Sequence, residues 1–275
     1  MKIYKTLMFF TLPLFTACTF GESNQIPDVV RTYEKQLKEE WEHIEKDFLC
    51  TLRISKQTWE TFKKNHQDQY KEIENDIKAD QKKEAVPLSD SFKNVITKLF
   101  ASLNIDTTNI DFSRNDKTHR LSSTDSAIFI SEDQLQEDNL TGDQLQAALL
   151  HEMQHIFHKD HSTLCFLGLY AQKNLLKKIK LFLFKRYRKK YEDLFVRVAH
   201  FREKRADIGA GLHSLKYAKA LLNFYKAELV NYEDKDTNTH PKTSKRVAYM
   251  QKLVDDMESD HIMSTGCLYK LPIKR

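Results

Sequence analysis

The sequence predicts a mainly α-helical protein with a small β-sheet, of the α+β class. Its 275 residues include only six Gly and five Pro, so few positions interrupt a helix. Apolar residues recur at helical spacing along most of the chain, and only two short segments have the composition of strands. Hydrophobic residues make up 40% of the chain, which is enough for a substantial core at this length.

Residues 1–18 predict an export signal. They begin with Lys2 and Lys5, continue with an apolar run from Leu7 and end in small residues before Cys18. The run is too short to span a bilayer as a mature helix. Its ending resembles a bacterial lipoprotein box, in which Cys18 is acylated, and cleavage without acylation is the alternative. We therefore expect a cell-envelope protein that faces the periplasm or the exterior, held to the membrane if Cys18 carries lipid.

Charge and cysteine content exclude two classes of function. The formal net charge is +5, and it falls to +3 without Lys2 and Lys5, which is too little to indicate a nucleic-acid-binding protein. Beyond the export signal the cysteines are Cys50, Cys165 and Cys267, which allow at most one internal disulfide and leave a thiol. None lies in a C-x-x-C pair, so zinc binding by cysteine has no support.

Residues 19–85 are expected to form a short tether and a helical hairpin. Two runs, 30–48 and 59–77, share an apolar spacing of three and four residues, and each predicts a helix with one narrow apolar stripe. These helices can pack on each other or across the main domain. A stalk or a coiled-coil contact with a partner is the alternative. Pro87 breaks the region, since proline disfavours helix at the preceding residue.

The main domain is expected over residues 86–275. An amphipathic helix is predicted over 89–103, and a polar interval after it contains two short strands near 110–112 and 126–131.

Residues 141–158 predict the helix around which the chain is organised. Thr141 can act as N-cap, and Gln144 completes a capping box with it. His151 and His155 stand at i and i+4, so their imidazoles share one helix face and can bind one ion. Glu152 follows the first His, where its carboxylate can reach a water on that ion. This H-E-x-x-H pattern predicts two zinc ligands and a general base for hydrolysis.

The strand expected over 126–131 lies just ahead of this helix. In many zinc peptidases a strand in this place binds the substrate backbone by edge pairing. An ordinary sheet strand is the alternative, and the sequence leaves both open.

Residues 173–190 contain nine Lys or Arg and no acidic residue, with an apolar stripe through them. Such a helix can lie on an anionic membrane surface, which would add a second membrane contact to a lipid anchor. A solvated charged face is an equally good interpretation.

Catalytic zinc requires a third protein ligand, and two candidates compete. His161 matches the long pattern H-E-x-x-H-x-x-G-x-x-H, but His158 stands where that pattern has a helix-breaking Gly. Glu203 is the second candidate, because Asp207 lies one turn later on the same helix face. Such a carboxylate can accept the free ring N–H of a ligating His and fix its tautomer.

Three motifs in this order resemble a known family. H-E-x-x-H at 151–155 is followed by E-x-x-x-D at 203–207 and by H-P-x-x-x-x-R at 240–246. Together they resemble the zinc metallopeptidase family of HtpX and the CAAX prenyl proteases, especially its soluble, exported bacterial members. The similarity covers roughly residues 89–258. It implies a zincin-like peptidase fold of the gluzincin type.

The resemblance also implies roles for individual residues. The ligands of one zinc ion per chain would be His151, His155 and Glu203. Glu152 would be the general base, and His240 would help to hold the oxyanion or cap the metal. Asp207 would support a ligating His, and Arg246 would steady the acidic helix.

The chain departs from the family pattern at three points. The family often has a His at the position of Asp160 and a small Gly at the position of Gln154. Both differences concern the packing of the metal helix. The transmembrane helices of many relatives have no counterpart here, which favours a peripheral enzyme.

The resulting hypothesis is a zinc-dependent metalloendopeptidase of the cell envelope. It would hydrolyse protein or peptide substrates, with envelope protein quality control as the expected setting. The rival is a non-catalytic surface lipoprotein that serves as a binding module or chaperone and keeps zinc for structure. A third hypothesis, membrane disruption by the basic helix, accounts for none of the three motifs.

Overall fold

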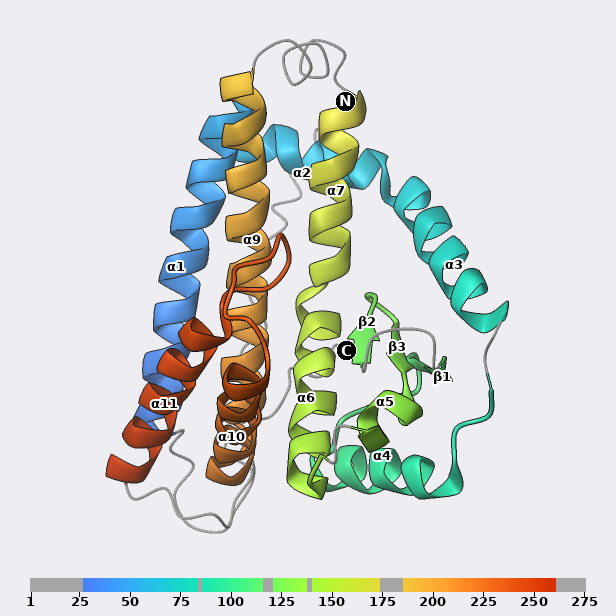
Figure 1. Cartoon of the computed structure of the whole chain (residues 1–275). Coiled ribbons are helices and arrows are strands. Elements are labelled where there is room, and N and C mark those ends of the chain that lie inside the picture. The colour runs from blue at the N-terminus through green and yellow to red at the C-terminus, as the bar shows by residue number, and fades with distance from the viewer. Residues whose placement is uncertain (1–26, 84–85, 116–120, 138–139, 174–184, 261–275) are drawn as a thin grey trace, which may run out of the picture.

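The computed structural model is mainly helical and has one small three-stranded sheet, so the expected class is confirmed (Figure 1). The residues that it describes are 27–83, 86–115, 121–137, 140–173 and 185–260. The helices are α1 (Asp28–Leu52), α2 (Lys56–Asn65), α3 (Gln67–Lys83), α4 (Asp90–Ser102), α5 (Glu132–Glu137), α6 (Gly142–His158), α7 (Asp160–Lys173), α9 (Lys185–Gly211), α10 (Leu215–Asn231) and α11 (Thr243–Ser259). The strands are β1 (Asp111–Arg114), β2 (Leu121–Ser123) and β3 (Ala127–Ile130).

The start of α6 is set by local chemistry, as the sequence predicts. The Thr141 hydroxyl accepts a hydrogen bond from the Gln144 backbone N–H at 3.2 Å, and the Gln144 side chain accepts one from the Thr141 N–H at 2.9 Å. These two bonds satisfy donors that the first turn of a helix otherwise leaves unpaired. The helix ends where Lys159 takes the left-handed conformation, with φ of 52°. That single residue turns the chain into α7.

Two apolar clusters hold the helices together, and α9 contributes to both. The first cluster joins α6, α10 and α11 with α4 and β3, and its most buried members include Leu149, Leu150 and Met153 of α6. The second cluster joins α7 with α2 and the C-terminal half of α1. Along α9, Phe201 belongs to the second cluster and Ile208 to the first. The α9 residues between them are mostly polar.

The N-terminal helices lie across the body of the protein rather than packing as an isolated hairpin. Figure 1 shows α1 running beside α9, and its stripe enters both clusters, through Val30 at one end and Phe48 at the other. The second predicted helix is interrupted at His66, which separates α2 from α3. Trp59 of α2 is buried with its ring centroid 5.3 Å from that of Phe48 and 5.9 Å from that of Tyr170.

The sheet corrects one expectation about the strand over 126–131. β3 is the central strand, parallel to β1 and antiparallel to β2. Its backbone is therefore paired on both sides, and the edge-pairing hypothesis is wrong for this strand. Among the described residues β2 pairs only with β3, so the edge beside α6 belongs to β2, which the sequence did not predict.

Several expected features lie outside the described residues. They are the export signal over 1–18 with Cys18, Cys267, and residues 174–184 of the basic run. Residues 185–190 of that run form the start of α9. Cys50 and Cys165 are both free thiols. Within the described ranges, no helix combines the length and apolar character needed to cross a membrane.

Gln154 fits in α6 because a glycine faces it from α9. The Gln154 side chain is fully buried, and a Cβ added at Gly209 would lie 2.6 Å from its Cδ. That distance is far below a normal contact, so Gly209 supplies the space that Gln154 fills. The close approach of α6 and α9 at Gly209 thus accommodates Gln154.

We expect Gly209→Ala to destabilise the protein by about 1–3 kcal/mol, because the new methyl group overpacks a filled interface. The double variant Gly209→Ala with Gln154→Ala should recover part of that loss, and urea unfolding measures both. Gly168→Ala in α7 is the matched control, since its added Cβ meets nothing within 4 Å. Equal behaviour of the two single variants would contradict this account.

Candidate metal centre

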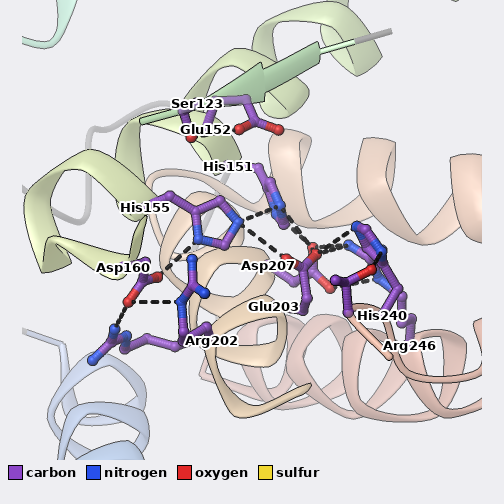
Figure 2. Close-up of polar contacts among 12 residues, drawn as sticks. Ser123, His151, Glu152, His155, Asp160, Arg202, Glu203, Asp207, His240 and Arg246 are labelled. Atoms are coloured by element: carbon purple, nitrogen blue, oxygen red, sulfur yellow. Dashed lines mark hydrogen bonds and ion pairs between the residues drawn. The ribbon is translucent and has the colours of Figure 1, made fainter. Parts of the chain in front are cut away.

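Two helices bring together the three side chains that could bind a metal ion. His151 and His155 come from α6 and Glu203 comes from α9, and all three are buried. The Nε2 atoms of the two His rings lie 3.0 Å apart. Glu203 Oε2 lies 3.6 Å from His151 Nε2, and Glu203 Oε1 lies 3.4 Å from His155 Nε2. Figure 2 shows both rings and the Glu203 carboxylate directed at one point. The spacing suits a single ion, because tetrahedral zinc holds two His nitrogens about 3.3 Å apart.

The other ring nitrogen of each His faces a buried carboxylate. His151 Nδ1 lies 2.8 Å from Asp207 Oδ1, and His155 Nδ1 donates a hydrogen bond of 2.8 Å to Asp160 Oδ2. A ring N–H at Nδ1 leaves Nε2 as an acceptor in the neutral imidazole. The hydrogen bond to Asp160 sets this tautomer for His155, and the nearby Asp207 carboxylate favours the same tautomer for His151. Asp207 was expected in this position, whereas Asp160 was not.

This arrangement fits a cation. When both rings are neutral with the proton on Nδ1, two Nε2 lone pairs and the Glu203 carboxylate converge. None of these three groups can then donate a hydrogen bond to the others. Glu203 Oε2 is buried and accepts no hydrogen bond from any described residue. Arg246 Nη2 lies 3.7 Å from this oxygen, too far for a hydrogen bond, and a buried carboxylate oxygen without a hydrogen bond favours a positive charge at closer range. A zinc ion would bind the two Nε2 lone pairs and the carboxylate at the same time, without a thiol ligand.

The electrostatics of the site favour positive charge. Burial alone would lower the pKa of His151, but the Asp207 and Glu203 carboxylates outweigh it and raise that pKa to about 10. Burial would likewise raise the pKa of Glu203, but the two His rings beside it hold that pKa well below its usual range. The carboxylates thus hold positive charge between the ligands whether it comes from protons or from a metal.

The Asp207 carboxylate links α9 to three other helices, α6, α10 and α11. Its carboxylate is fully buried and accepts hydrogen bonds from Arg246 Nε at 2.9 Å and from the Tyr225 hydroxyl at 2.6 Å. The Tyr249 hydroxyl also donates to it. Burial would raise the pKa of Asp207, but Arg246 and His151 hold it well below its usual range. Arg246 thus lies against both carboxylates of the E-x-x-x-D motif on α9.

Glu152 lies on the side of the ligand cluster that faces the sheet. The Ser123 hydroxyl of β2 donates a hydrogen bond of 2.7 Å to Glu152 Oε2, as Figure 2 shows. Ser123 was not predicted, and no local pattern could have found it, because it pairs with a residue on another element. The carboxylate is held beside the ligand cluster rather than within it.

His240 approaches the cluster from a loop between α10 and α11. Its Nε2 lies 3.5 Å from Glu203 Oε2, while its Nδ1 is 2.8 Å from the Thr239 hydroxyl. Thr237 fixes the loop, since its hydroxyl accepts from the His240 N–H at 2.9 Å. The side chain is 55% exposed, so this ring, unlike those of α6, reaches both solvent and the site.

His161 does not join the cluster. Its Nδ1 lies 3.3 Å from the Tyr70 hydroxyl, and the ring also contacts Cys165. Those partners belong to α3 and α7, and burial lowers the pKa of His161. Of the two candidate third ligands, the structure brings Glu203 to His151 and His155.

A cleft of about 940 Å³ opens onto the cluster. Its walls include β2, the His240 loop and the faces of α6 and α10 that look toward each other. One part of the wall is apolar and is made by Leu121, Leu135, Leu140, Ala148, Leu221 and Phe224. The buried ligands therefore remain accessible to a molecule larger than water.

Comparison with known proteins yields no relative. No family model, no curated protein and no solved structure matches this chain.

We expect Glu203→Ala to lower zinc affinity by more than the roughly 10–100-fold that loss of a ligand's supporting contact costs. The reason is that Glu203 supplies one of only three convergent ligand groups in the described part of the chain. Mass spectrometry of metal content on the purified full chain measures the loss.

His161→Ala is the matched control and should keep the parent's zinc content. Zinc retention in Glu203→Ala together with loss in His161→Ala would contradict the ligand assignment.

Proposed function

We propose that the protein is a zinc-dependent metalloendopeptidase with a gluzincin-type centre. The observation that supports it best is the convergence of His151, His155 and Glu203 in a buried cluster that opens to a cleft, with Glu152 beside it. A purely structural zinc site closes with four protein ligands and has no use for a neighbouring base. The order of the three motifs supports the same family, the zinc metallopeptidases that resemble HtpX.

Each residue has a role in amide hydrolysis under this proposal. Zinc, when bound, would polarise the scissile carbonyl and lower the pKa of a water molecule. Glu152 would take the proton from that water and pass it to the leaving amine. His240, with its Nε2 at the edge of the cluster, would donate to the oxygen that gains charge. Asp207 would keep His151 in the tautomer that binds metal.

β2 supports a peptide as the substrate class. Leu121, Ser122 and Ser123 line the cleft, and the outer edge of this strand has no partner among the described residues. An extended peptide could add to that edge by backbone hydrogen bonds, which reads a chain without requiring particular side chains. The apolar part of the cleft could then take one hydrophobic side chain next to the scissile bond.

The proposed setting is the cell envelope, with protein quality control as the expected role. It rests on the sequence of residues 1–18, with Cys18 as the lipid attachment site and the basic run 173–190 as a further membrane contact. The competing proposal is a non-catalytic lipoprotein that binds or chaperones other proteins.

Glu152→Gln separates catalysis from metal binding. The amide keeps the shape of the side chain but cannot accept the proton, so kcat/KM for a fluorogenic peptide or unfolded casein should fall about 10²–10⁴-fold. Zinc content should stay at the parent level, because Glu152 is not one of the converging ligand groups.

Retained cleavage in this variant would remove Glu152 as the base. A parent that binds zinc and cleaves none of these substrates would favour the binding-module alternative.

Cys18→Ser tests the membrane setting. If Cys18 is acylated, the variant should move from the membrane fraction to the soluble fraction, since one thiol carries the anchor. Fractionation after expression in a bacterial host measures the change, and Cys50→Ser serves as a control because Cys50 lies on an exposed face of α1. An unchanged membrane fraction for Cys18→Ser would leave the basic run as the only membrane contact proposed.

A further inference from the structure

A buried carboxylate outside the three motifs contacts the metal centre. Asp160 is the first residue of α7, and only 1% of its surface is exposed. The left-handed turn at Lys159 brings it back toward α6, where its Oδ2 accepts the hydrogen bond from His155 Nδ1. An uncompensated carboxylate at this depth would be expensive, so its remaining contacts decide what it does.

Two arginines of α9 hold the other oxygen of the same carboxylate. Arg202 Nε lies 3.3 Å from Asp160 Oδ1, and Arg205 also contacts Oδ1. The two oxygens of Asp160 are thus divided, one toward the His and one toward the arginines. In Figure 2 this group lies on the opposite side of the ligand cluster from His240 and Arg246. The arginines fix where the carboxylate stands and therefore how the His155 ring is turned.

Aromatic side chains hold Arg205 in turn, and one of them belongs to α1. The guanidinium carbon lies 5.3 Å from the Phe201 ring centroid and 5.8 Å from the Trp41 ring centroid. The Trp41 and Phe201 rings are stacked, with centroids 5.5 Å apart. Cation–π contacts of this kind restrict a guanidinium that would otherwise sample several rotamers. Contacts therefore run without interruption from α1 to a metal ligand.

We propose that Asp160 is the positioning residue for His155 and that Trp41, acting through Arg205, makes helix α1 part of the metal centre. This inference rests on the proposed zinc site. It extends that site to a helix outside the region over which the family resemblance runs, since 89–258 does not include α1. The N-terminal region is then a component of the centre rather than an appendage.

The test measures metal binding and ligand geometry separately from catalysis. The full chain and its variants are stripped of metal and titrated with Zn²⁺ against a chromophoric chelator. Cobalt-substituted samples report ligand geometry through their visible absorption, which a change in global stability alone would leave unmoved. Thermal unfolding of the metal-free proteins shows that each variant is folded.

Asp160→Ala should weaken zinc binding by about 10–100-fold and shift the cobalt spectrum. Asp160→Asn, which keeps an acceptor oxygen for His155 Nδ1, should recover much of both. Trp41→Ala should weaken zinc binding by about two- to fivefold, the equivalent of one cation–π contact, while Trp41→Phe should retain the parent's affinity.

Asp47→Asn is the matched control for general loosening of α1. It removes another tie between α1 and α9, the 2.8 Å ion pair with Arg197, which does not touch Asp160. The proposal predicts parent-like zinc affinity and an unchanged cobalt spectrum for this variant. A Trp41→Ala effect no larger than that of Asp47→Asn would overturn the role of α1.

Two further outcomes separate this inference from the proposed function. A parent that binds zinc normally, with Asp160→Ala binding equally well, overturns the positioning role and leaves the zinc site standing. A folded parent that takes up no zinc overturns both.

Discussion

The structure depends on one electrostatic constraint, the convergence of three acceptor groups inside the protein. Each His of α6 turns its Nδ1 toward a buried carboxylate, so in the neutral rings each Nε2 faces the other with a lone pair. Such a geometry is unfavourable unless positive charge lies among the three groups. With the carboxylates of Asp207 and Asp160 behind the two rings, the space between α6 and α9 could hold a metal ion.

The same constraint explains the layout of the core. The polar layer lies where α9 passes from one apolar cluster to the other, between Phe201 and Ile208. Apolar packing on both sides keeps α6 and α9 close, and the ligands face the cleft. Arg246 anchors one end of the layer through Asp207, and the arginines of α9 hold the other through Asp160. Asp207 and Asp160 are thus each matched by a buried arginine, which offsets the cost of burying their charges.

Sequence reasoning succeeded where the cause is local. The capping box at Thr141 and the spacing of His151 and His155 depend on residues within two turns, and both are found as expected. The class of the fold followed from composition and periodicity. The interruption at His66 was missed, because an apolar stripe can continue through a bend.

Contacts between elements could not be predicted in the same way. β2 has three residues and no distinctive pattern, so neither its pairing nor its hydrogen bond to Glu152, 29 residues away, could be foreseen. The space for Gln154 depends on a glycine of another helix.

The left-handed turn at Lys159 has a further consequence for how the chain can vary in length. One residue inserted or deleted in the last turn of α6, after His155, would rotate the following Asp160 by about 100° around the axis of α6, away from its His. Homologues that keep this centre should therefore tolerate insertions in other connections but preserve the five-residue interval here.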